Sequence, residues 1–394
     1  MRYLLIISCL LFTLPSYALT VAAEQLGAYL PLLQGKKVGL IVNHTSLVKD
    51  AHLVDVLQAK GIEVKRIFAP EHGFRGDADA GASIADGIDL KSGLPIVSIY
   101  GASKKPAPHW LQDLDVLVFD IQDVGARFYT YISSMHYMME SAAEQGLEFI
   151  VLDRPNPNIA YVDGPVLEAP FRSFVGMHPI PLLHGMTVGE LAQMIKGENW
   201  FAGSEKLQLK VIPVADYDAS MSYALPVSPS PNLPNAQAIA WYPSLCLFEP
   251  TQVSIGRGSD WPFQVIGHDK VKLGNFSFTP KPNFGAAKPK LEGQHLYGLD
   301  LRTLTSQGLD LSLLWQTAKL FRDAKTELIT SERFFDKLAG TDKVRLALNK
   351  GESLESVVAS WQADLARFKL KRQPYLLYAR EVHKATVEAV QSKN

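Results

Sequence analysis

The run Val38-Gly-Leu-Ile-Val42 is apolar, and the polar residues Asn43, His44 and Thr45 follow it directly. A short, continuous apolar run that is bounded by turn residues is typical of a strand buried on both faces. The next segment, His52–Lys60, has the spacing of a helix. This pair predicts the first unit of a fold in which strands and helices alternate.

The same alternation continues to about residue 158. Helical periodicity recurs over Tyr129–Gln145. Short apolar strands that alternate with helices indicate a parallel sheet that is covered on both faces, so the sequence predicts an α/β fold. The further predicted strands are Val64–Phe68, Leu94–Tyr100, Asp115–Phe119 and Phe149–Leu152.

Polar or turn-forming residues follow each of the five predicted strands. In an open parallel sheet, ligands bind in the crevice beyond the carboxyl ends of the strands, so we expect a site at this edge. Polar loops and helix caps would give the same pattern without a site. The residues are Asn43 and His44 after the first strand, Glu71, His72 and Arg75 after the second, Gly101 after the third, Asp120, Gln122 and Asp123 after the fourth, and Asp153, Arg154 and Asn156 after the fifth.

A second, smaller domain is expected after the sheet, because the chain beyond residue 240 is long enough to form one. We therefore divide the mature chain into residues 19–240 and 241–394. Residues 164–243 are rich in proline and loops and contain one predicted helix. Thr187 and Glu190 form a capping box at the start of this helix, so Glu190 is predicted to be a helix cap. The second domain is expected to contain helices over Leu311–Leu328 and Leu354–Phe368 and a surface loop over Gly274–Lys290.

Residues 1–18 have the pattern of a signal peptide. Arg2 is basic, the apolar run Leu4–Leu14 is too short to cross a bilayer, and Ser16-Tyr-Ala18 fits a cleavage site. A membrane anchor and a buried helix are the alternative interpretations. The pattern predicts an exported protein, in the periplasm or secreted, with no stable membrane span after cleavage near Ala18. Cys246 is then the single cysteine of the mature chain, which excludes an internal disulfide and predicts a buried thiol.

The composition is that of a globular protein, with 47% hydrophobic and 20% charged residues among 394. Its 39 basic and 40 acidic residues balance, which argues against a nucleic-acid partner. The turn Asn43-His-Thr-Ser46 lacks the Gly-x-Gly of a dinucleotide site, and neither a nucleotide phosphate loop nor a Gly-x-Ser-x-Gly nucleophile motif is present. No His-x-x-x-His spacing points to a metal, although His and Asp side chains at one rim leave a metal-dependent hydrolase as a possible function.

Carboxylate chemistry fits the strand ends better. Glycoside hydrolysis uses two acidic groups, or one acid together with an acetamido group of the substrate. Glu71 emerges from the apolar residues Phe68-Ala-Pro70, and an apolar setting favours the protonated carboxyl group that a general acid requires. His72 and Arg75 are near enough in sequence to tune it. The candidates for a second acid are Asp120, Asp123, Asp153 and Glu249.

A series of long motifs runs through the chain: Ala69-Pro-Glu-His-Gly-Phe-Arg-Gly76, Phe119-Asp-Ile-Gln-Asp-Val-Gly-Ala-Arg-Phe-Tyr-Thr-Tyr131, Leu152-Asp-Arg-Pro-Asn-Pro157, His184-Gly-Met-Thr-Val-Gly-Glu190, Ser230-Pro-Asn-Leu-Pro234, Phe335-Asp-Lys-Leu-Ala-Gly340 and Arg372-Gln-Pro-Tyr-Leu-Leu-Tyr378. With these motifs the chain resembles the exo-β-N-acetylmuramidase family from about Gln25 to Tyr378. It departs from the family pattern at Glu249-Pro-Thr-Gln252 and Gly256-Arg-Gly-Ser259, where Glu-Gly-Thr-Asn and Gly-Arg-Gly-Thr are expected. This difference bears on substrate preference more than on the reaction.

The resemblance implies a glycosidase that releases N-acetylmuramic acid from the non-reducing ends of peptidoglycan fragments. It also implies a Rossmann-like first domain, a smaller α/β second domain and an active-site cleft between them. Glu71, within Pro-Glu-His-Gly, would be the catalytic glutamate. The expected partner is a muropeptide or disaccharide with terminal N-acetylmuramic acid, and no cofactor is expected. The rival hypothesis is a non-catalytic periplasmic protein that binds glycans or solutes.

Muramic acid carries a lactyl carboxylate, for which a bidentate guanidinium is the natural partner. Arg75, Arg127, Arg154 and Arg257 are the candidates, with surface salt bridges as the alternative role. We predict that Glu71, His72, Asp120 and Asp123 are catalytic. The predicted substrate contacts are Asn43, Arg75, Gln122, Arg127, Tyr129, Asp153, Arg154, Asn156, His184, Asn232, Glu249 and Arg257, and no metal ligand is predicted.

Overall fold

The computed structural model describes residues 19–75, 86–101 and 103–380. The predicted signal peptide, residues 1–18, lies outside these ranges, and so does Gly76 of the motif around Glu71. Among the described residues, none of the helices combines the length and the apolar character that a membrane crossing requires.

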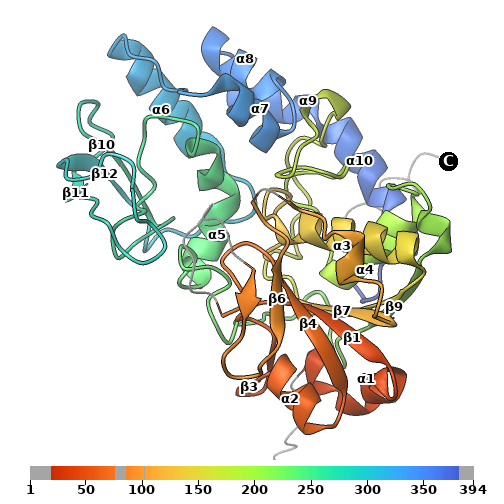
Figure 1. The fold of residues 1–394 in the computed structure, drawn as a ribbon. Coiled ribbons are helices and arrows are strands. Elements are labelled where there is room, and N and C mark those ends of the chain that lie inside the picture. Colours follow the sequence, from red (N-terminus) through yellow and green to blue (C-terminus); the bar gives the residue numbers. More distant parts are fainter. Residues whose placement is uncertain (1–18, 76–85, 102, 381–394) are drawn as a thin grey trace, which may run out of the picture.

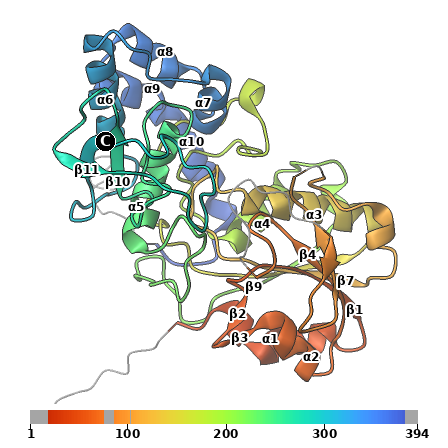
Figure 2. The ribbon, with the colours of Figure 1, turned by 60° about the vertical axis from the view of Figure 1, so that its left-hand side comes forward.

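A seven-stranded sheet forms the first domain, in the order β5-β6-β4-β1-β7-β8-β9 (Figures 1 and 2). All neighbouring strands are parallel except β5 and β6. Numbered along the chain, the six parallel strands follow the order 3-2-1-4-5-6 of a Rossmann sheet. The strands are β1 (Lys37–Val42), β4 (Glu63–Ala69), β5 (Gly87–Ile88), β6 (Pro95–Ser98), β7 (Val116–Asp120), β8 (Glu148–Leu152) and β9 (Gln208–Ile212), with a separate hairpin of β2 (Leu47–Val48) and β3 (Ala51–His52).

The five predicted strands are confirmed as β1, β4, β6, β7 and β8, whereas β9 was missed within a stretch predicted to be mostly loops. The strand β9 has the sequence Gln-Leu-Lys-Val-Ile and pairs with β8 at the edge of the sheet. Because much of an edge strand stays accessible, polar residues replace the continuous apolar run that identified the inner strands.

Helices cover both faces of this sheet, as the apolar strands predicted. Side chains from alternate positions of β1 and β7 belong to two different clusters: one packs on α1 and α2, the other on α3 and α4 (Figures 1 and 2). The capping box at the start of α4 is confirmed, since Thr187 and Glu190 each accept the other's backbone N–H. The helices are α1 (Leu26–Leu33), α2 (Leu53–Ala59), α3 (Tyr131–Gln145) and α4 (Val188–Gly197).

The second domain combines a three-stranded antiparallel sheet, in the order β10-β12-β11, with the helices that follow α5. The helix predicted over Leu354–Phe368 is two helices that meet at Trp361, and the loop predicted over Gly274–Lys290 contains β11. The domain boundary predicted between residues 240 and 241 falls inside α5 and stays a prediction. The elements are α5 (Ala236–Leu245), β10 (Val265–His268), β11 (Phe276–Phe278), β12 (Leu296–Asp300), α6 (Ser312–Asp323), α7 (Glu332–Ala339), α8 (Lys343–Lys350), α9 (Leu354–Ser360) and α10 (Gln362–Lys371).

Six short 3-10 helices connect these elements among the described residues: η1 (Ala22–Glu24), η2 (Pro108–Trp110), η3 (Ala169–Phe171), η4 (Ser204–Lys206), η5 (Cys246–Phe248) and η6 (Gln373–Tyr375).

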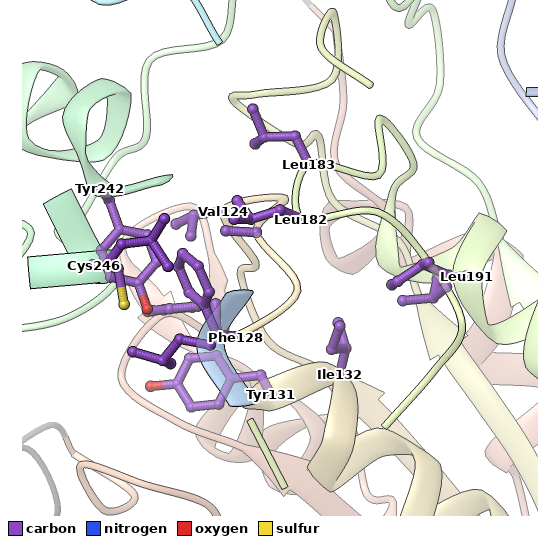
Figure 3. Packing of buried hydrophobic residues seen from close by; sticks show 14 of the residues in the cluster. Val124, Phe128, Tyr131, Ile132, Leu182, Leu183, Leu191, Tyr242 and Cys246 are labelled. Atoms are coloured by element: carbon purple, nitrogen blue, oxygen red, sulfur yellow. The ribbon is translucent and has the colours of Figure 1, made fainter. Parts of the chain in front are cut away.

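The two domains share one hydrophobic cluster. Phe128, which precedes α3, meets Tyr242 of α5 edge to face, with ring centroids 5.2 Å apart. Cys246 lies beside this contact (Figure 3), and its thiol is buried and free, as predicted. Near the end of the described chain, Tyr378 returns to the first domain and hydrogen-bonds Asp153. The core therefore continues across the junction of the domains and fixes the walls of the space between them.

Candidate functional site

A pocket of about 950 Å³ lies between the two domains, and we call it the cleft. The first domain contributes Glu71, Tyr100, Phe128, Thr130, Phe174 and Val175; the second contributes Tyr242, Cys246, Glu249, Ser254, Ile255, Arg257, residues 285–290, Phe334 and Leu338. A smaller space of about 70 Å³ adjoins it, and we call this the inner cavity. The inner cavity shares Glu71, Phe128, Thr130, Tyr242 and Arg257 with the cleft and adds His72, Tyr129, Tyr131, Ser230, Asn232, Leu233 and Phe263.

Glu71 reaches the cleft through a sharp turn after β4. His72 and Gly73 both adopt left-handed backbone conformations, with φ of 69° and 76°, and the N–H of Gly73 donates to Pro70 O at 3.1 Å. A left-handed conformation is unfavourable for histidine, so the turn stores strain beside the candidate catalytic residue. Glu71 is partly exposed rather than sealed in the interior.

Two hydroxyl groups hold the Glu71 carboxyl group. Thr130 Oγ1 lies 3.0 Å from Glu71 Oε2, and the Tyr100 hydroxyl faces the same carboxyl group. The sequence predicted an apolar setting for this group, and the described structure instead gives it polar contacts on one side and an open pocket on the other. The carboxyl group is therefore both oriented and accessible.

His72, Tyr129 and Asn232 line the inner cavity, where the sequence had placed them at the site. His72 Nε2 lies 3.4 Å from Ser230 Oγ. The Tyr129 hydroxyl donates to Pro229 O at 2.7 Å, and Asn232 Nδ2 donates to Gly285 O at 2.7 Å. Through these bonds the segment around Ser230 is fixed against both domains, so the inner cavity has firm walls.

Glu249 and Arg257 form an ion pair in the wall of the cleft. Arg257 Nη2 and Nε lie 2.7 and 2.9 Å from Glu249 Oε1, and the guanidinium stacks over the Phe263 ring at 5.0 Å. Burial alone would lower the pKa of Arg257, but the Glu249 carboxylate outweighs it and raises that pKa. The cleft thus contains a fixed positive group that an anionic ligand can reach.

Lys290 fixes the segment that carries Glu249. Its Nζ donates to the carbonyl oxygens of Phe248, Glu249, Thr251 and Val253 at 2.6–3.2 Å. Burial lowers the pKa of this ammonium group to about 8. The loop predicted to lie on the surface therefore reaches the cleft and supports the ion pair.

The other three candidate arginines lie outside the cleft. Arg75 pairs with Asp89 at 2.7 and 2.9 Å. Arg127 is fully buried and donates to four carbonyl oxygens, two of which, those of Leu338 and Ala339, belong to α7. Neither side chain lines the cleft or the inner cavity, so their role as substrate contacts stays a prediction, and Arg127 ties the two domains together.

Arg154 and Asp120 form a buried ion pair at the end of β7. Arg154 Nε and Nη2 lie 2.6 and 2.9 Å from the Asp120 carboxylate, and both residues are almost fully buried. Asn43 and Gln122 join the same closed network. Asn43 Oδ1 accepts the N–H and the hydroxyl of Thr45, and Gln122 Nε2 donates to the main-chain carbonyl oxygens of Asp123 and Pro155. None of these four residues lines the cleft or the inner cavity.

Asp123 and His184 are buried away from the cleft as well. Burial raises the pKa of Asp123 to about 7 and lowers that of His184 to about 3. His184 Nε2 lies 3.9 Å from Asp123 Oδ2, beyond hydrogen-bond distance. Asp123 lines neither the cleft nor the inner cavity, and its catalytic role stays a prediction.

Asp153 and Asn156 support the chain after β8. Asp153 is fully buried and accepts from Thr187 Oγ1 and Gly189 N at 2.7 and 2.8 Å. Burial raises its pKa to about 6. Asn156 Nδ2 donates to Met186 O at 2.9 Å and borders a separate cavity of about 550 Å³. Neither side chain reaches the cleft.

Several residues of the cleft were missed by the sequence analysis: Tyr100, Thr130, Phe174, Tyr242 and Lys290. Tyr100 lies just beyond β6, which ends at Ser98, and at the same sheet edge as Glu71. The sequence placed Tyr100 as the last residue of the predicted strand Leu94–Tyr100, so only a correct strand end could have identified it. Among the described residues, no group of three or more His, Cys, Asp or Glu side chains is placed to hold a metal ion.

Comparisons with known proteins agree with this architecture. The family models "Exo-beta-N-acetylmuramidase NamZ, N-terminal" and "C-terminal" match residues 38–237 and 240–378. The chain is 39% identical over 376 residues to peptidoglycan beta-N-acetylmuramidase NamZ of Bacillus subtilis (strain 168), covering 89% of each protein. It is also similar to two crystal structures of DUF1343 family proteins from Bacteroides fragilis NCTC 9343. The first structure has a TM-score of 0.84 and 42% sequence identity, and the match covers 92% of this chain and 99% of the other. The second structure has a TM-score of 0.79 and 31% sequence identity, and the match covers 91% of this chain and 99% of the other.

Proposed function

This chain belongs to the exo-beta-N-acetylmuramidase family, and from that premise we propose that it removes N-acetylmuramic acid from the non-reducing ends of peptidoglycan fragments. Membership of this family makes it a glycosidase that acts on peptidoglycan. We propose further that it acts from the end of the glycan chain, that this end is the non-reducing one, and that the residues named below carry out the reaction.

The position of Glu71 is the observation that carries the proposed mechanism. Among the described residues, Glu71 is the one carboxylic residue that lines both the cleft and the inner cavity. We assign it the role of general acid: its proton passes to the bridging oxygen as the bond from that oxygen to the sugar C1 breaks, and the electron pair of the bond stays on the oxygen. Water completes the hydrolysis, because its oxygen adds to C1 and it releases a proton. Glu249 is the other carboxylic residue of the cleft, and it is engaged by Arg257.

Arg257 is our candidate for binding the lactyl carboxylate. It is the one candidate arginine that lines the cleft, and Glu249 and Phe263 hold its guanidinium in place. A guanidinium has five donors, so it can bind a second carboxylate while it keeps Glu249. A muramic acid whose lactyl group is amide-linked to a peptide has no free carboxylate, and we therefore expect peptide-free ends to be preferred.

Export rests on the pattern of residues 1–18, with a basic residue, a short apolar run and a cleavage site. We propose that the protein acts in the periplasm or outside the cell. Fractionation of cells that express the full chain, compared with a chain that starts at Leu19, tests this. Cleavage and export of the full chain alone is expected, and retention of both forms in the cytoplasm would contradict it.

The exo activity is tested with two disaccharides that contain the same sugars in opposite order. The expected result is release of N-acetylmuramic acid only from the disaccharide that carries it at the non-reducing end. Hydrolysis of both would contradict the proposed specificity. Tight binding of the first disaccharide without any product after a day would instead favour a binding protein.

A further inference from the structure

Thr130 occupies the N-cap position of α3 without capping the helix. Its backbone is helical (φ −71°, ψ −4°), and its side chain makes no capping hydrogen bond. Thr187 at the start of α4 shows the usual arrangement, with an extended backbone (ψ 169°) and a hydroxyl that accepts the N–H of Glu190. A threonine at this position normally stabilises a helix through such a bond. The Thr130 hydroxyl is directed to Glu71 Oε2 instead, at 3.0 Å.

Tyr100 reaches the same carboxyl group from another element. It lies beyond the end of β6, and its hydroxyl faces Glu71. Burial, and after it the charge of Glu71, raises the pKa of Tyr100, so the hydroxyl keeps its proton. Its ring contacts Phe174 in the wall of the cleft, with centroids 5.9 Å apart, which limits its motion. Glu71 is thus held from the sheet edge and from the start of α3.

Thr130 and Tyr100 each present a hydroxyl group to Glu71, and hydroxyl groups have a chemical property that matters here. A hydroxyl donates to an ionised carboxylate and accepts from a protonated carboxyl group, because its proton can rotate. A guanidinium or a backbone N–H can only donate, and it would favour the ionised form alone. A general acid must pass through both forms in each turnover.

We propose that Thr130 and Tyr100 are positioning residues that keep the Glu71 carboxyl group in one orientation before and after it gives up its proton. Before substrate binds, the hydroxyl beside the protonated oxygen accepts the single carboxyl proton, and this proton then turns to the bridging oxygen of the bound substrate. After the proton has moved to the bridging oxygen, both hydroxyls donate to the carboxylate. The carboxylate recovers a proton from water before the next turnover. This inference rests on the proposed role of Glu71 as the acid.

The test compares Thr130→Val with Thr130→Ser. Valine keeps the shape of threonine without the hydroxyl, so kcat on a chromogenic muramide should fall about tenfold to hundredfold, the range for losing a hydrogen bond to a charged group. Serine keeps the hydroxyl and should stay within about threefold of the wild type. The melting temperature of Thr130→Val should not fall, because no capping bond is lost. Tyr100→Phe should lower kcat in the same way.

The opposite pattern would overturn the inference: a lower melting temperature with unchanged kcat in Thr130→Val would mean that Thr130 only stabilises α3. Combination with Glu71→Gln separates this inference from the proposed function. If Glu71→Gln is inactive while Thr130→Val and Tyr100→Phe are fully active, the positioning role fails and the acid stands. If Glu71→Gln is fully active, the proposed function fails. With both ideas correct, Thr130→Val should not lower the residual activity of Glu71→Gln further.

Discussion

The carboxyl edge of the sheet has a closed region and an open region. At the ends of β1, β7 and β8, polar side chains such as Asn43, Asp120 and Asp153 are fully buried and bonded within the protein. At the ends of β4 and β6, Glu71 and Tyr100 are partly exposed and line the cleft. Polar residues after a strand therefore identify the edge of the sheet. Whether that part of the edge is open to a ligand depends on the residues, far away in the sequence, that bond to these polar side chains.

The closed region coincides with the switch point of the Rossmann order, between β1 and β7, where ligands of this architecture usually bind. Here Gln122 N donates to Thr45 Oγ1 at 3.0 Å, and the Ser46 hydroxyl bonds the carbonyl of Asp120. These bonds join the turn after β1 to the end of β7 across the switch point. The candidate site lies instead beyond the ends of β4 and β6, and the second domain forms the opposite wall of the cleft.

The largest effect in the closed region is expected from Arg154→Leu. It would leave the fully buried Asp120 carboxylate without its partner, which should cost about 3–5 kcal/mol of unfolding free energy. Urea denaturation at pH 7 measures it. The double variant Asp120→Leu/Arg154→Leu is the control and should recover much of the loss. An unchanged midpoint in Arg154→Leu would show that the region is not closed in the way described.

Asp123 gives the closed region a pH dependence. Burial raises its pKa to about 7, so the folded protein holds this proton more tightly than the unfolded chain does. Its contribution to the unfolding free energy should therefore be lost as the pH rises from about 4 to about 7, by an amount on the order of 4 kcal/mol. Asp123→Asn should remove this slope and be the more stable protein at pH 8. Parallel stability curves for both proteins would contradict the burial of an ionisable Asp123.

In the open region, Arg257→Leu should weaken muramide turnover. Loss of a hydrogen-bonded charge pair with the substrate is worth about 1.5–3 kcal/mol, or roughly 10- to 150-fold in kcat/KM. Turnover of the corresponding glucosaminide, which lacks the lactyl group, should change far less. Arg75→Leu is the matched control, since Arg75 pairs with Asp89 outside the cleft. Equal losses on both sugars, or an equal loss in Arg75→Leu, would remove Arg257 from carboxylate recognition.

Much of the first domain could be predicted from the sequence, because its inner strands are continuous apolar runs. The edge strand β9 could not, since its polar residues hide the pattern. Glu71 was identifiable because it follows a strand directly. The closed network was not, because its partners are distant in sequence: Arg154 bonds Asp120 across 34 residues, and Tyr378 bonds Asp153 across 225. Local patterns carry no information about such pairings.

The most direct test replaces one carboxyl group in each region by its amide and measures kcat/KM on a chromogenic β-N-acetylmuramide. Glu71→Gln, in the open cleft, should lose at least about a thousandfold, close to 4 kcal/mol of barrier reduction. Asp123→Asn, in the closed region, should stay within about threefold of the wild type. A fully active Glu71→Gln variant beside an inactive but folded Asp123→Asn variant would place the chemistry in the wrong region and contradict the account.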